Sequence, residues 1–190
     1  MTLDFSNRKY FLISIVGSHA GEDATTIFSR KQRELKDNGG TYWLLKSFKA
    51  KTRQIQSFCK KAEQGGEEIH CLFIDSSSKN GARPTMHNTS VTHISHNGTD
   101  WGQLPLNMRM TGKIDLQSSA LVLDELELFD KHLDIDLWDF SEFETGGPVE
   151  LQLGASTVCC IRKPSNGMKS RHRKIIARGK LTYPHAVFVS

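Results

Sequence analysis

The stretch TYWLLKSFKAKTRQIQSFCKKAEQGGEEIHCLFID, residues 41–75, decides the fold class expected for this chain of 190 residues. Its first part, Thr41–Ser47, is apolar and aromatic, which is typical of a buried strand. A helix is expected at about Lys49–Gln64, because apolar residues recur there with the spacing of one helix face: Ile55, Phe58, Cys59 and Ala62. Gly65-Gly66 ends this helix, and Glu68–Asp75 is expected to form the next strand.

The residues before this stretch predict a further strand and a further helix. Tyr10–Val16 is interpreted as a buried strand and not as a leader peptide. Asp23 is a suitable N-cap for a helix at Ala24–Lys36, and Asn38-Gly39-Gly40 ends that helix. Residues 1–75 therefore predict the order β-α-β-α-β.

The residues after Asp75 follow a different pattern. A polar loop at Ser76–Ser90 precedes Val91–Leu104, which predicts a β-hairpin with its turn at Asn97-Gly98. Later segments alternate apolar with polar residues, as in an antiparallel sheet with one wet face: Ala120–Phe129, Leu133–Leu137, Val149–Leu153, Lys174–Thr182 and Tyr183–Val189.

The expected fold class is therefore α+β, with an N-terminal β-α-β-α-β segment followed by a mainly antiparallel, β-rich half. We expect a single domain over residues 1–190. It can be subdivided into an α/β part at residues 1–75 and a β-rich part at residues 76–190.

Hydropathy and cysteine usage predict a cytoplasmic protein without a membrane partner. The longest apolar run lies within Phe11–Val16 and is far shorter than the roughly 20 residues of a transmembrane helix. None of the four cysteines belongs to a CxxC pair, and Cys159 and Cys160 are adjacent. A disulfide framework is therefore not expected, and a reducing compartment is.

Charge is distributed in blocks, although the net charge is only +4. Residues 115–150 hold eleven acidic residues and one basic residue, whereas residues 151–190 hold eight basic residues and no acidic one. A high density of cations suits a phosphate backbone, because each contact releases condensed counterions. The candidate nucleic-acid-binding residues in the basic block are Arg162, Lys163, Lys169, Arg171, Arg173, Lys174 and Arg178. The alternative is a charge ladder, in which Lys174, Arg178 and Lys180 lie opposite acidic residues on neighbouring strands.

Two further features support a nucleic-acid partner. Lys79 and Arg83 occur among small hydroxyl and amide side chains in the Ser76–Ser90 loop, a composition that suits phosphate contacts. Trp101 follows the expected hairpin turn and can stack on an unpaired base if it is exposed. The alternatives are a solvated loop and a tryptophan packed into the core.

A metal site and a cofactor are not expected. His87, His93 and His96 are close in sequence, but His93 and His96 fall on opposite faces of a strand, and no cysteine pair completes the site. Gly17–Gly21 lies between a strand and a helix, where a glycine-rich loop can bind phosphate. Two acids follow it directly, so we interpret it as a plain turn.

No catalytic motif is recognisable, and we lean against an enzyme. Asp124, Glu125 and Glu127 lack the spaced lysine that a metal-dependent nuclease would place beside its acids. The serines and cysteines lack the strand–turn–helix context of an activated nucleophile. The catalytic residues are therefore unknown.

Thr41–Ser47 also resembles the opening strand of PUA-like domains of the EVE and YTH type, which read modified bases in nucleic acid. The resemblance covers seven residues, TYWLLKS, and Phe48-Lys49 stands where the EVE members place Glu-Pro. We assign no functional residue from it.

Three functions stay open. The first is nucleic-acid binding through the phosphate backbone, as part of a larger complex. The second is an assembly subunit or adaptor, in which the acidic block at residues 115–150 and the basic block meet different protein partners. The third is a small-molecule or nucleotide-processing enzyme built on the N-terminal half, with the Gly17–Gly21 loop at its site.

Overall fold

The computed structural model describes residues 8–16, 22–45, 52–75, 89–112, 118–149, 157–163 and 171–190. Within these ranges two α-helices accompany one nine-stranded sheet, so the expected α+β class is confirmed. In chain order the elements are β1 (Tyr10–Val16), α1 (Ala24–Asn38), β2 (Thr41–Leu45), α2 (Thr52–Gln64), β3 (His70–Asp75), β4 (His93–Ser95), β5 (Trp101–Gln103), β6 (Ser119–Asp136), the 3-10 turn η1 (Leu137–Asp139), β7 (Phe140–Glu142), β8 (Thr157–Arg162) and β9 (His172–Val189).

Local signals in the sequence set the ends of α1. The side chain of Asp23 accepts a hydrogen bond from the backbone N–H of Thr26 at 2.7 Å, which satisfies one of the free donors of the first turn. Gly39 has φ 71° and donates its N–H to the carbonyl of Leu35 at 2.8 Å. A left-handed residue at this position ends a helix at little cost only when it is glycine.

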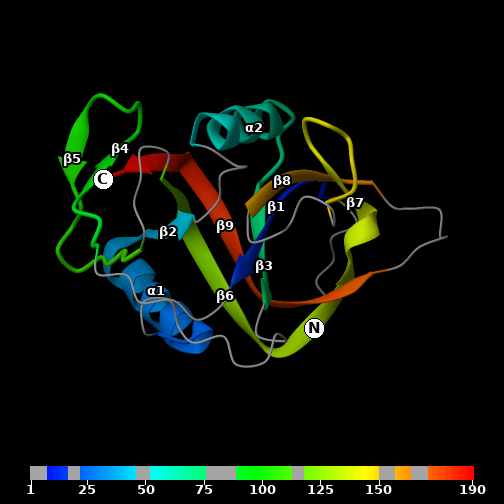
Figure 1. Ribbon diagram of the computed structural model, residues 1–190, viewed down its shortest axis with the longest axis horizontal. Coiled ribbons are helices and arrows are strands. Elements are labelled where there is room, and N and C mark those ends of the chain that lie inside the picture. Colours follow the sequence, from blue (N-terminus) through cyan, green and yellow to red (C-terminus); the bar gives the residue numbers. More distant parts are fainter. Residues whose placement is uncertain are drawn as a thin grey trace.

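The strand order shows that the sheet curls back on itself (Figure 1). Its main path runs β2-β6-β9-β3-β1-β8-β7, with β1 and β3 parallel. In that order four other strands lie between β6 and β7, yet only the three residues of η1 connect them. So short a connection can join them only if the sheet bends round until its two distant parts meet.

Strands β6 and β9 are the longest, with 18 residues each, and they pair antiparallel over most of their length. We expected four shorter strands in these two regions, and that prediction of separate segments is wrong. Each strand is interrupted by a bulge in the middle of its pairing: residues 129–132 of β6 and residues 182–185 of β9 have no register partner on the other strand. Bulges bend a ribbon and increase its twist, which helps the sheet to curl.

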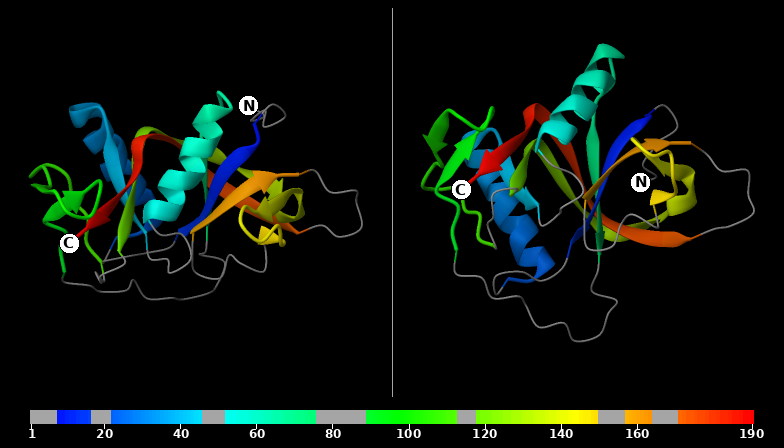
Figure 2. Two further views of the ribbon diagram at one scale, coloured as in Figure 1. Left: turned by 90° about the horizontal axis from the view of Figure 1, so that it is seen from above. Right: turned by 45° about the horizontal axis from the view of Figure 1, so that its top comes forward.

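Three apolar clusters pack on the curled sheet, and the third joins Ala120 of β6 and Val187 of β9 with Val91 beside β4. Both helices pack on the outer face, where Phe28 of α1 and Phe58 of α2 join one cluster with residues of the central strands. The second cluster fills the inside of the curl and includes Phe11, Leu72 and Phe140. Figure 2 shows that β7 and β8 lie at the opposite end of the molecule from β4 and β5.

The β4–β5 hairpin forms where the sequence predicts it, but its turn is longer than the expected two-residue turn. Ser95 pairs with Trp101, so five residues connect the strands. The side-chain oxygen of Asn97 accepts hydrogen bonds from the N–H groups of Thr99 and Asp100, both at 2.9 Å. The asparagine therefore organises a wider loop through its side chain.

Neither α1 nor α2, the helices of the described ranges, is both long enough and apolar enough to cross a bilayer.

Candidate nucleic-acid interface

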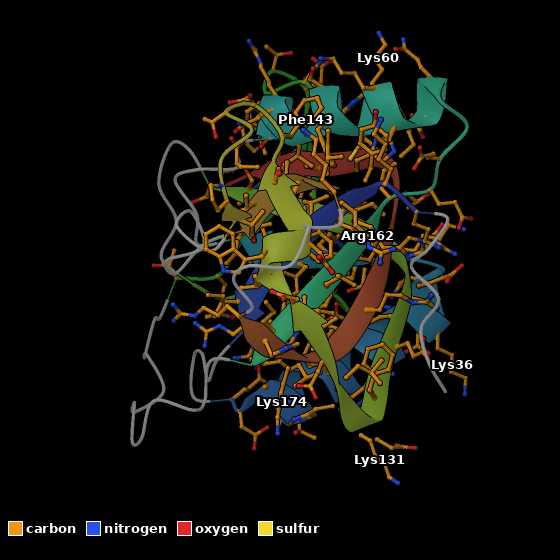
Figure 3. The ribbon with its side chains drawn as sticks, turned by 90° about the vertical axis from the view of Figure 1, so that its right-hand side faces the viewer. Lys36, Lys60, Lys131, Phe143, Arg162 and Lys174 are labelled. Carbon is orange, nitrogen blue, oxygen red and sulfur yellow. The ribbon has the colours of Figure 1, made fainter. Side chains whose placement is uncertain are left out.

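Five of the predicted cations lie together at the curled end of the sheet. We call this group the cationic end; its members are Arg162, Lys163, Arg171, Arg173 and Lys174. Arg162 is the last residue of β8, and Arg171 directly precedes β9. Lys163, Arg171 and Lys174 are exposed, and Arg162 and Arg173 are half-buried. Figure 3 looks towards this end of the molecule and labels Arg162 and Lys174.

The 3-10 turn η1 holds the two halves of the cationic end together. The backbone N–H of Leu137 donates to the carbonyl of Arg171 at 3.1 Å, and the N–H of Lys163 donates to the carbonyl of Asp139 at 2.7 Å. The end of β8 and the start of β9 are therefore fixed on either side of one short turn. Trp138 of the same turn is half-buried, and its backbone N–H donates to the side chain of Asp136.

Carboxylates at this end have structural tasks as well as charge. One oxygen of Asp136 accepts hydrogen bonds from the N–H groups of Trp138 at 3.0 Å and of Arg171 at 2.9 Å. That arrangement caps η1 and fixes the backbone of Arg171. Asp134 lies directly opposite Lys174 in the register of β6 and β9. The five cations thus share this end with Asp134, Asp136 and Asp139, and still outnumber them.

Further along β9 the predicted cations belong to a charge ladder. Arg178 contacts Glu127 at 3.0 Å, and Lys180 contacts Glu125 at 3.3 Å, in each case directly across the pair of strands. Lys180 also contacts Glu68 at 3.0 Å; this hydrogen bond is the main reason that the pKa of Glu68 is lowered and that of Lys180 raised. The ladder that we considered as the alternative is therefore present at these positions.

The remaining predicted residues do not join the cationic end. Lys79, Arg83 and Lys169 lie outside the described residues, as does the Gly17–Gly21 loop on which the enzyme hypothesis depended. Trp101 is 44% exposed, but it belongs to β5, at the other end of the molecule.

Within the described residues, neither the histidines nor the cysteines form a metal site or a reactive thiol. His87 lies outside the described residues, and within them no group of three or more histidine, cysteine, aspartate or glutamate side chains could hold a metal ion. All four cysteines are buried, unpaired thiols, and burial raises their pKa values, which keeps them protonated.

Sequence reasoning missed two polar clusters. One surrounds Tyr183 and His185 in the bulge of β9, and the other surrounds the buried His70 of β3. A proline inside an alternating strand pattern, here Pro184, is a local signal of a bulge and could have indicated the first. No local signal marks the second, because its members come from separate strands.

The comparisons with known proteins identify no relatives. The chain matches no protein-family model, no curated protein and no solved structure.

Proposed function

We propose that this protein binds nucleic acid through phosphate contacts at the cationic end. The observation that supports the proposal is that η1 fixes the end of β8 and the start of β9 on either side of one short turn, where five cations that are separated in the sequence occur. Fixed cations bind a polyanion better than mobile ones, since less side-chain and backbone freedom is lost on binding. In this proposal the N-terminal β-α-β-α-β segment supports the cationic end, since β1 pairs with β8 and β3 pairs with β9.

The proposal involves fewer residues than the sequence suggested. Arg178 has a carboxylate opposite it in the sheet, so a phosphate would have to compete with Glu127 for its guanidinium. Phosphate contacts from the cationic end carry no sequence information, and we therefore propose a reader of backbone and shape. Four unpaired thiols suit a reducing compartment, which supports a cytoplasmic location.

The adaptor hypothesis has less support, because β6 and β9 bring much of the acidic block and the basic block together within the chain. Glu125, Glu127 and Asp134 lie opposite Lys180, Arg178 and Lys174. Carboxylates that neutralise neighbouring strands in this way have less charge to offer a protein partner.

The test is fluorescence anisotropy with labelled single- and double-stranded DNA and RNA over a series of salt concentrations. A double variant, Arg171→Ala with Lys174→Ala, removes two exposed cations from the cationic end. The matched control, Arg33→Ala with Lys36→Ala, removes two exposed cations from α1. We expect binding that weakens linearly with the logarithm of salt concentration, with a slope about 1.4 to 1.8 shallower in the first variant and unchanged in the control.

Two results would overturn the proposal. One is the absence of binding to any of the four nucleic acids at low salt. The other is an equal loss of affinity in both double variants, which would indicate a diffuse effect of net charge and not contacts at the cationic end.

A further inference from the structure

The bulge of β9 lies where this strand changes its neighbour. On one side, β9 pairs with β3 as far as Lys180, which lies opposite His70. On the same side, from Phe188 onwards, β9 pairs with β4, where Phe188 lies opposite Ser95. Residues 182–185 lie between these two partners and also lack a register partner on β6. Figure 1 shows this part of β9 bending between β4 and α2. The backbone here is consequently held by side chains in place of a neighbouring strand.

Contacts from α2 hold the bulge in one conformation. The side-chain amide of Gln56 donates to the carbonyl of Ala186 at 2.8 Å and to the carbonyl of His96 at 3.0 Å, so it joins the bulge to the β4–β5 turn. His185 is buried, and its Nε2 lies 3.0 Å from a carboxylate oxygen of Glu63. These contacts keep His185 at φ 65°, a left-handed conformation that costs a residue with a side chain about 1–2 kcal/mol.

The result is an aromatic ring displayed on a rigid base. Tyr183 is 70% exposed, whereas an aromatic side chain of a strand is usually packed. The ring of His96 stands against it edge to face, with centroids 5.1 Å apart and planes at 74°, and the Tyr183 hydroxyl lies 3.5 Å from Nδ1 of His96. This contact holds the ring on one side, while most of the Tyr183 surface remains exposed.

The helix α2, which holds the bulge, also carries exposed cations. Gln56 and Glu63, which contact the bulge and the turn, lie on one flank of the helix. At 100° per residue, the exposed Arg53 and Lys60 fall about 40° to 80° further round the helix, away from its buried stripe. Figure 3 shows Lys60 extending from α2 away from the sheet. The helix that holds the bulge therefore also presents positive charge to solvent.

We propose that Tyr183, with His96 at its edge, is a stacking site for an unpaired base of a single-stranded nucleic acid. Every base has a π-face, so such a site tolerates any sequence, and the flanking phosphates would meet the cations of α2. In a duplex the faces of the bases are covered by their neighbours, which restricts the site to single strands. The inference rests on nucleic acid being the partner, but it concerns a surface separate from the cationic end.

The experiment compares a short thymidine oligonucleotide with an abasic oligonucleotide of the same length, which carries the same phosphates without bases. We expect the wild-type protein to bind the first about tenfold more tightly or better. Tyr183→Ala should lose this preference with an unchanged salt slope, while Tyr183→Phe, which keeps the ring, should retain it. Leu106→Ala removes a 99% exposed apolar side chain elsewhere and should leave both affinities unchanged.

The outcomes separate this inference from the proposed function. Equal binding of both oligonucleotides by the wild type, or an unchanged preference in Tyr183→Ala, would overturn the stacking site while phosphate binding stands. Binding of neither oligonucleotide would overturn the stacking site, and the salt series with the four nucleic acids would then decide the proposed function separately. If Tyr183→Ala does not fold, photo-cross-linking of a bromouracil oligonucleotide to the wild type decides: attachment at Tyr183 or His96 supports the site, and attachment only elsewhere overturns it.

Discussion

Replacing His70 with leucine should make the stability of this protein less sensitive to mild acid, by about 2 kcal/mol between pH 7 and pH 5. His70 is 1% exposed, and neither ring nitrogen has a hydrogen-bond partner within the described part of the chain. Burial, followed by the positive charges of Arg8 and Arg178, lowers its pKa to about 4, against the weaker opposing effect of Glu68. The imidazole is therefore held neutral inside the sheet.

The magnitude follows from proton linkage. A histidine in the unfolded chain has a pKa of about 6.5, so between pH 6.5 and pH 4 the unfolded chain binds a proton that the folded chain excludes. The free energy of unfolding contributed by His70 is fully present above about pH 6.5 and declines as the pH falls towards 4. From the two pKa values, the loss at pH 5 relative to pH 7 is about 2 kcal/mol.

The assay is urea unfolding of wild type and His70→Leu at pH 7 and pH 5. The carboxylates with lowered pKa values, such as Glu34 and Glu68, remain charged in the folded protein over this range, and their residual effect is common to both chains. His132→Leu, at an exposed histidine, is the control and should follow the wild type. If the wild type and His70→Leu lose equal stability between the two pH values, the burial argument is refuted.

Three further substitutions test the packing of the sheet and of α1, each by urea unfolding at pH 7. Glu34→Ala should cost about 3–5 kcal/mol, because it leaves the 3% exposed Lys31 without the carboxylate 2.7 Å away; a cost below 1 kcal/mol would show that this ion pair is not needed. Gly179→Ala should cost about 1–3 kcal/mol, since the new Cβ would lie 3.2 Å from the Leu123 methyl groups; a gain in stability would show that the chain relaxes there. Asp23→Ala should cost about 1 kcal/mol through the lost N-cap, and an unchanged midpoint would contradict that role.

The two helices and the strands β1 to β5 could be predicted from the sequence because their signals are local. The apolar stripe of α2 and the caps of α1 need only neighbouring residues to be recognised. The two long strands could not, because each contains a bulge that interrupts its alternation: Lys131 lies in one and Pro184 in the other. An interruption of this kind has the same local pattern as a turn between two strands.

The candidate site was predicted only in part, for a related reason. Composition identified the basic block, but which cations are neutralised depends on the register between β6 and β9, and residues such as Glu127 and Arg178 are 51 positions apart. The stacking site depends on Gln56 of α2 reaching both the β4–β5 turn and the bulge of β9. Contacts between such distant segments follow from topology and leave no trace in a window of sequence.

The register between β6 and β9 also accounts for the position of the cationic end. Antiparallel pairing places the acidic block beside the basic one. Carboxylates such as Glu125 and Glu127 therefore lie opposite cations in the middle of β9 and neutralise them. This pairing stops at Asp136 opposite His172, and Arg171 and, across η1, Arg162 and Lys163 lie beyond it. A chain with a net charge of only +4 therefore carries more cations than aspartates where the ladder ends, because several of its other acids, such as Glu125 and Glu127, are placed along the ladder.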